Sequence, residues 1–204
     1  MISGFGRAVS AGLPLAFVIS IGGATVRSPV PGQPVPADTG RPRYTAADVR
    51  FMQGMIEHHA QAVTMAALVA GRSSRQDVRL LARKIDVSQQ DDIAMMRRWL
   101  GERHEGVPEL EAGHEHHDLM PGMLTPEEMT QLAKASGAEF DRLFLQGMIK
   151  HHEGALTMVA ALFARSGAGQ EPQLFGFASD VDADQRAEIR RMRAMLDALP
   201  PTPQ

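Results

Sequence analysis

The pattern of apolar and polar residues after residue 43 predicts long helices that are separated by short turns. In the first half of this region, helices are expected over residues 45–70 and 74–100, and a glycine follows each of them as a stop signal. Thr45 and Asp48 stand at the spacing of a capping box, which marks the start of the first helix.

The second half of the region predicts two further long helices and one short helix. One long helix is expected over residues 136–165 and the other from the turn at 167–172 to about residue 199, and the short helix over residues 126–135. Ser136 with Glu139 forms a better capping box than the pair in the first half. The short helix has a threonine cap and a proline at its first position.

The two halves are copies of one sequence. Residues 51–67 align with residues 144–160 at an offset of 93, and eleven of the 17 aligned positions are identical. A second block aligns at an offset of 96 and pairs Gln89, Ile93, Met96 and Leu100 with Gln185, Ile189, Met192 and Leu196. A repeat of this length is too long for a solenoid unit, so we interpret it as a duplicated half of one domain. The predicted fold is all-α, an antiparallel four-helix bundle built from two helical hairpins.

The first 42 residues are expected to be a targeting segment and a spacer. An uncharged, largely apolar stretch separates Arg7 from Arg27, and small residues near Ala24 suit a signal-peptidase site. We expect export to the periplasm or the cell exterior, with an uncleaved membrane anchor as the alternative. The expected divisions are a signal peptide or N-terminal anchor at 1–27, a proline-rich spacer at 28–42 and the duplicated bundle at 43–199. Within the bundle, repeat 1 covers 43–101, a His- and Met-rich linker covers 102–124, and repeat 2 covers 125–199.

Composition limits the chemistry that the chain can perform. The formal net charge is -3, which gives no basis for nucleic-acid binding because phosphate contacts need a basic surface. The chain has no cysteine, so a metal ion would need ligands from His, Met, Asp, Glu or Gln. The 13 methionines are many for a chain of 204 residues, although methionine most often fills gaps in an apolar core.

The histidines of the repeats form two equivalent doublets, His58-His59 and His151-His152. Adjacent residues on a helix point about 100° apart, so one doublet is not expected to hold a single ion with both rings. The better-preserved face carries Met55, His58 and Met65 in the first copy and Met148, His151 and Met158 in the second. We predict that this face supplies the firmer metal ligands, with His59 and His152 as further candidates.

The second helix of each hairpin adds a Gln, a carboxylate and a Met at the spacing i, i+3 and i+7. These residues are Gln89, Asp92 and Met96 in the first copy and Gln185, Glu188 and Met192 in the second. If both faces turn inward, imidazole, thioether and carboxylate groups share the interior of the bundle. Imidazole with thioether sulfur suits Cu(I), with Ag(I) as a mimic, and imidazole with carboxylate suits Cu(II). The alternative is a polar core that only orients the helices.

The linker contains a second candidate metal site. Three imidazoles and two thioethers fall within ten residues there, at His114, His116, His117, Met120 and Met123. Pro121 and Gly122 predict a turn, so these ligands can rearrange around an ion at low strain. The residues around these two methionines are polar, so packing in an apolar core does not explain the methionines well. The alternative is a solvated loop that binds divalent ions weakly.

Three motifs characterise the region, and the first two occur once in each copy. They are Met-Ile-x-His-His-x-x-Ala-x-x-Met in the first helix of each copy, Gln-x-x-Asp/Glu-Ile-x-x-Met in the second, and Met-Pro-Gly-Met-Leu-Thr-Pro-Glu-Glu at 120–128. Together they resemble the domain-of-unknown-function family 305, and the resemblance covers residues 44–199. It implies a ferritin-like helical bundle. Leu145 in place of a methionine and Asp92 in place of a glutamate depart from the pattern.

The resemblance also carries a functional expectation. Some members of the family are periplasmic copper-binding proteins linked to copper resistance, which implies metal contacts at the two doublets and the neighbouring methionines. We therefore expect an exported protein that buffers or delivers copper or confers resistance to it. A copper-handling protein would be its partner in delivery.

Two other functions compete with copper binding. A ferritin-like di-metal oxidoreductase needs Glu-x-x-His motifs, but no Glu stands three residues before a His of either doublet. A helical scaffold that binds a protein partner without metal is the other alternative. We expect no catalysis, because the chain has no Cys and no Ser lies within either repeated His motif.

Overall fold

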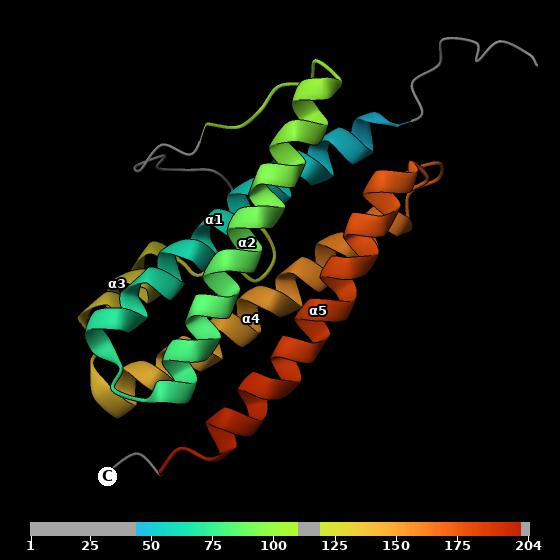
Figure 1. Ribbon diagram of the computed structural model, residues 1–204. Helices are drawn as coiled ribbons and strands as arrows, with labels where there is room; N and C mark the ends of the chain where they lie inside the picture. Colours follow the sequence, from blue (N-terminus) through green and yellow to red (C-terminus); the bar gives the residue numbers. More distant parts are fainter. Residues whose placement is uncertain (1–43, 110–118, 201–204) are drawn as a thin grey trace, which may run out of the picture. The chain divides into compact units, whose positions relative to one another are not determined.

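The computed structural model describes residues 44–109 and 119–200, and the regular structure in these ranges is entirely helical. The helices are α1 (Ala46–Arg72), α2 (Gln76–Glu102), α3 (Pro126–Lys134), α4 (Gly137–Phe163) and α5 (Pro172–Asp197), as Figure 1 shows. Every boundary lies within two residues of the one expected from the sequence, and the all-α fold class is confirmed. The expected signal peptide or anchor and the spacer lie outside the described residues.

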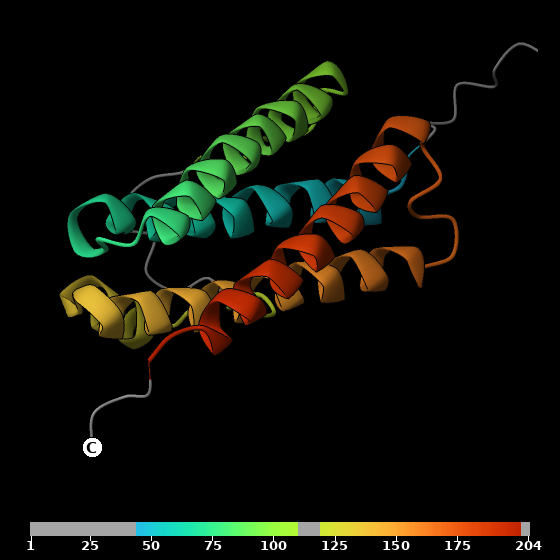
Figure 2. The same cartoon turned by 60° about the horizontal axis from the view of Figure 1, so that its bottom comes forward.

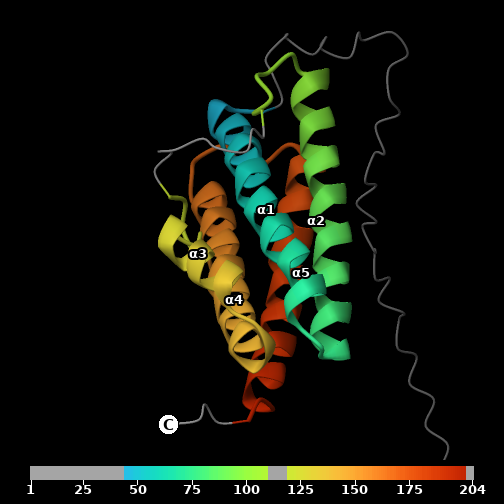
Figure 3. The ribbon, with the colours of Figure 1, turned by 90° about the vertical axis from the view of Figure 1, so that its left-hand side faces the viewer.

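Two antiparallel helical hairpins make up this part of the chain, α1 with α2 and α4 with α5 (Figure 2). Helix α1 of the first hairpin lies along α4 of the second, and these two helices also run in opposite directions (Figure 3). The short helix α3 lies against α4. The duplication in the sequence therefore corresponds to two hairpins that meet through their first long helices. Among the described helices, none has the combined length and apolar character that crossing a membrane requires.

The helix starts follow the sequence in two cases and depart from it in one. Capping boxes form at Thr45, with Asp48, and at Thr125, with Glu128. The box expected at Ser136 does not form, because the Ser136 side chain makes no capping hydrogen bond. The next residue, Gly137, has φ +60°, so the chain enters α4 through a left-handed residue. We attribute the missing bond to this different approach of the backbone.

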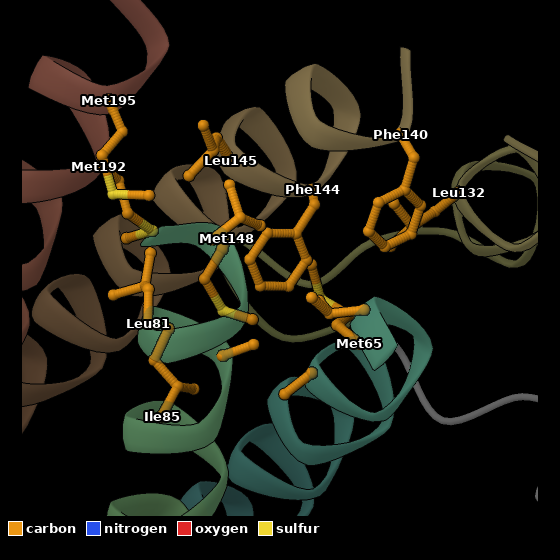
Figure 4. Close-up of a cluster of buried hydrophobic side chains, with 14 of the residues drawn as sticks. Met65, Leu81, Ile85, Leu132, Phe140, Phe144, Leu145, Met148, Met192 and Met195 are labelled. Atoms are coloured by element: carbon orange, nitrogen blue, oxygen red, sulfur yellow. The ribbon is translucent and has the colours of Figure 1, made fainter. Parts of the chain in front are cut away.

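Two clusters of buried apolar side chains fill the interior, one toward each end of the long helices. The first cluster includes Met65, Leu81, Phe144, Met148 and Met192, which Figure 4 shows gathered together. The second includes Met55, Met96, Trp99, Val159 and Phe177. Each long helix contributes to both clusters, and the two His doublets lie where α1 and α4 pass from one cluster to the other. The polar groups of the candidate site therefore form a layer between two apolar layers.

The end of the linker runs close to both α1 and α4. On α1, the Gln61 side chain donates to the carbonyl oxygen of Leu124 (3.0 Å) and accepts from its amide (2.8 Å). On α4, Gly154 leaves room for the linker, because a Cβ there would lie 2.7 Å from the Cα of Gly122 and would overlap the carbonyl group of Pro121. Gln61 and Gly154 are equivalent positions of the two copies. The linker is therefore held where the copies differ.

Gly154→Ala should destabilise the fold by about 1–3 kcal/mol, the usual cost of forcing atoms into a filled space. Gly176→Ala in α5 is a matched control, because a Cβ there would meet no atom within 4 Å. This control should gain about 0.5–1 kcal/mol, since alanine favours a helix over glycine. Urea unfolding measures both changes. Two variants of equal stability would contradict the close contact between linker and α4.

Candidate metal centre

Four imidazoles, from the two His doublets, lie fully buried at the middle of the bundle. Within each doublet the rings diverge, with centroids 6.5 Å apart for His58 and His59 and 6.3 Å apart for His151 and His152. The two doublets meet through His58 and His151, whose ring centroids are 3.8 Å apart. The helix geometry predicts this divergence, and the crossing of α1 with α4 creates an inner pair of rings from different copies.

The inner pair is held by backbone carbonyl groups. The Nε2 atom of His151 lies 2.9 Å from the carbonyl oxygen of His58, and Nε2 of His58 lies 3.0 Å from the carbonyl oxygen of Pro121. A carbonyl oxygen can only accept a hydrogen bond, so both Nε2 atoms must donate. The linker thus supplies one of the two acceptors for the inner pair.

The outer imidazoles are held by carboxylates of their own hairpins. Nε2 of His59 lies 3.2 Å from Asp92, and Nε2 of His152 lies 2.9 Å from Glu188. Lys84 of α2 also approaches Glu188 (3.1 Å), which joins the two hairpins. The carboxylates therefore orient the rings in the manner common behind metal-binding histidines.

These hydrogen bonds fix which nitrogen of each ring carries the proton. In a neutral imidazole one nitrogen is a donor and the other has a lone pair. Because each Nε2 donates, the lone pair is at Nδ1, and all four buried Nδ1 atoms lack a hydrogen-bond partner among the described residues. Each ring therefore offers an unused ligand atom in the same polar layer.

Burial keeps His58, His59 and His151 uncharged. It lowers the pKa of His58 to about 3, aided by the nearby His59 ring and opposed by the Pro121 carbonyl. It also holds the pKa of His151 well below its usual value, and the other three imidazoles lower it further. For His59, burial lowers the pKa more than the bond to Asp92 raises it. The uncharged imidazole is the form that binds a metal ion.

Glu188 stays ionised despite its buried position. Burial raises its pKa, but the hydrogen bond from His152 and the charge of Lys84 together outweigh that effect and leave the pKa below its usual value. A negative charge is thus kept beside the second copy's outer imidazole. This charge can balance a cation that binds at the ring.

The methionines of the predicted face do not gather at one point. Met55 belongs to the second apolar cluster, whereas Met65 and Met148 belong to the first. Ten residues separate Met55 from Met65, and at 1.5 Å per residue this places them roughly 15 Å apart along α1. Two thioethers at this separation do not share one ion. Met158 is half-buried at the edge of the second cluster.

The linker site is described only in part. Met120 and Met123 are half-buried, and Met120 lies beside α1. His114, His116 and His117 lie outside the described residues. In residues 44–109 and 119–200, no three His, Asp or Glu side chains come together as a set that could hold a metal ion.

Three contributors to the site were not among the residues predicted from sequence. Gln61 and Gly154 position the linker, and Lys84 bridges the hairpins at Glu188. The only sequence signal for the first two is that they differ between copies inside a block that otherwise matches closely. Lys84 has no such signal.

The fold and the site define a class of protein, a duplicated helical hairpin with a buried layer of histidines. A family model, the domain of unknown function DUF305, matches residues 48–196. The chain belongs to the DUF305 family. This confirms the resemblance drawn from the motifs.

Solved structures share the fold. A DUF305 fragment from Deinococcus radiodurans is 33% identical with a TM-score of 0.67, over 76% of this chain and 99% of that one. A candidate secreted DUF305 protein from Streptomyces coelicolor is 30% identical with a TM-score of 0.64, over 74% and 92% of the two chains. CopM in its Cu(II)-bound form is 28% identical with a TM-score of 0.62, over 74% and 95%. CopM structures with Cu(I) and with Ag also match.

A curated relative matches only a segment of the chain. It is an uncharacterised protein, L153, of Acanthamoeba polyphaga mimivirus, and it is 38% identical over 56 residues. The match covers 28% of this chain and 37% of the relative, so the two proteins share little more than a third of the relative's length.

The buried imidazoles should make the metal-free protein less stable in mild acid. In the unfolded chain a histidine with a pKa near 6.5 takes up a proton that the folded His58 does not. The unfolded state then binds more protons, so the free energy of unfolding falls as pH falls. Between about pH 7.5 and about pH 5.5 we expect a loss of roughly 1 kcal/mol for each such imidazole, measured by urea unfolding.

A pair of variants separates this effect from other titrations. His58→Gln with His151→Gln should flatten the dependence of stability on pH. His104→Gln, at an exposed position outside the layer, should leave it as in the parent. An unchanged slope in the double variant would show that these rings do not cause the effect.

Proposed function

We propose that the protein is an exported copper-binding protein that takes up Cu(I) in the layer of buried histidines, with copper as its cargo. One observation carries the proposal. All four buried imidazoles donate from Nε2 to an oxygen, and their four Nδ1 atoms have no partner among the described residues. The inner pair, His58 and His151, is the proposed principal site.

The energetic cost of this arrangement favours metal binding over a purely structural network. An unpaired buried polar atom costs about 1–3 kcal/mol, and this one layer contains four such imidazole nitrogens. A network that only oriented the helices would be expected to pair both nitrogens of each ring, since a partly satisfied network weakens a fold. A metal ion at Nδ1 uses the lone pair and removes the cost.

The inner and outer rings favour different copper ions. The inner pair lies between apolar layers that contain thioether sulfur, so its surroundings suit the soft ions Cu(I) and Ag(I). Each outer ring holds a carboxylate, and this combination suits Cu(II) better. The similarity to CopM, whose structures include Cu(I)-, Cu(II)- and Ag-bound forms, supports this choice of ions.

The carboxylates argue for binding over oxidase chemistry. A ferritin-like di-metal centre uses glutamates as direct, bridging ligands. Here Asp92 and Glu188 accept hydrogen bonds from imidazoles instead. We assign them a positioning role and propose no catalytic residue. Buffering, delivery to a copper-handling partner protein and resistance are all compatible with such a site.

Export is the second part of the proposal. It is supported by the apolar N-terminal stretch in the sequence and by the similarity to a candidate secreted protein. The absence of cysteine also fits export, because an oxidising compartment oxidises thiolate ligands more readily than His or Met ligands.

Anaerobic titration of metal-free protein with Cu(I) or Ag(I), against a competing chelator, tests the proposal. His58→Ala with His151→Ala should abolish the tightest site, because both inner ligands are lost. His104→Ala is the matched control, since this histidine is exposed and outside the layer, and it should bind as the parent does. Far-ultraviolet circular dichroism confirms that each variant is folded.

The linker provides the alternative outcome. If the inner double variant binds Cu(I) as tightly as the parent, the bundle is not the principal site. Alanine substitution of His114, His116 and His117 then shows whether the linker binds the ion instead. Iron-dependent oxygen consumption by the parent would favour the di-metal oxidoreductase over copper binding.

A further inference from the structure

Two thioethers from different parts of the chain converge over Gly54 of α1. A Cβ on Gly54 would lie 3.1 Å from the sulfur of Met120 and 3.6 Å from the terminal methyl of Met158. Met120 comes from the linker and Met158 from α4. Both residues are only partly buried, so the pair lies at the surface of the bundle rather than in its buried interior. The sequence placed these two methionines in separate candidate sites.

The other copy contains the same contact in a purely apolar form. Gly147, the equivalent of Gly54, would place its Cβ 3.2 Å from the methyl group of Met65 and 3.1 Å from Leu124. Leu124 is 4% exposed and Met65 is fully buried. A hydrocarbon side chain from the linker therefore satisfies this kind of contact. Apolar packing over Gly54 would therefore not require a sulfur atom from the linker, yet Met120 places one there beside Met158.

The pair of thioethers lies next to the inner imidazoles. Gly54 precedes His58 by four residues, which is one turn on the same face of α1. Met120 immediately precedes Pro121, whose carbonyl oxygen accepts the hydrogen bond from His58. The inner rings themselves are fully buried. The chain thus places partly buried soft ligands directly beside fully buried nitrogen ligands.

We propose that Met120 and Met158 form a receiving site for a soft univalent ion, Cu(I) or Ag(I), which then passes to the buried inner imidazoles. The two thioether sulfurs donate lone pairs to the ion, and no oxidation or reduction is involved. The receiving site stands on the geometry over Gly54, whereas the onward step rests on the proposed function. This assigns the linker a part in loading the bundle rather than a separate store of metal.

Methyl-labelled methionine reports the first contact with the ion directly. The full chain, metal-free and labelled with carbon-13 at the methionine methyl groups, is titrated with Ag(I). The methyl signals are assigned with single Met→Leu variants, which conserve volume. In spectra followed over time after each substoichiometric addition, the signals of Met120 and Met158 should shift first, and the ring signals of His58 should change later as the ion passes to the tighter inner site. The Met95 signal should stay in place.

Loading kinetics give the second readout. Met120→Leu with Met158→Leu should lose the early shift and fill the imidazoles more slowly than the parent. Met95→Leu is the matched control, because Met95, like Met158, is half-buried against the second apolar cluster. It should fill at the rate of the parent. These variants keep the inner imidazoles, so the final occupancy of that site should not change.

The outcomes separate the two proposals. One outcome is that the imidazoles of the double Met variant fill at the parental rate and the parent shows no early methyl shift. This outcome overturns the proposed receiving site and leaves the proposal of copper binding by the bundle intact. The opposite outcome combines two results. Met120 and Met158 shift early, and the variant His58→Ala with His151→Ala binds as much ion as the parent. This outcome upholds the thioether site and overturns the proposed function of the inner pair.

Discussion

The contact between His58 and His151 is the constraint on which the rest of the bundle depends. Two fully buried rings with centroids 3.8 Å apart cannot both be charged, so the fold must keep them neutral and give each Nε2 an acceptor. For His151 that acceptor is a helical carbonyl of α1, and for His58 it is the carbonyl of Pro121. The crossing of α1 with α4 and the path of the linker are therefore parts of one arrangement.

The duplication gives two equivalent halves, and the linker makes them unequal. A symmetric pair of hairpins would offer His58 a carbonyl of α4, but the linker takes that place. The linker can do so because Gly154 leaves room for it on α4 and because Gln61 of α1 forms hydrogen bonds with the linker backbone. The apolar clusters on both sides exclude water from the layer between them. This exclusion strengthens the electrostatic interactions inside the layer.

The sequence was sufficient for the elements and their faces but not for their register. Capping residues and glycines located the helix ends within two residues, and the angle between neighbouring positions predicted that each doublet would diverge. Helical periodicity says which residues share a face, but not which residue of α4 that face meets. The pairing of His58 with His151 and the approach of Met120 to Gly54 depend on that register and on the course of a loop. At Ser136 the local motif was also insufficient, because Gly137 turned the backbone away from the expected cap.

The outer carboxylates make the two halves electrostatically different. Glu188 is 6% exposed and shares its charge between His152 and Lys84. Asp92 pairs with His59, and no Lys or Arg of the described residues bridges it. The Asp92 side chain is 36% exposed, so water screens its charge, whereas the charge of Glu188 lies in the interior of the bundle. The linker brings the sulfur of Met120 to α1. The soft ligand therefore favours the first copy and the more deeply buried carboxylate favours the second, although the imidazoles themselves are duplicated.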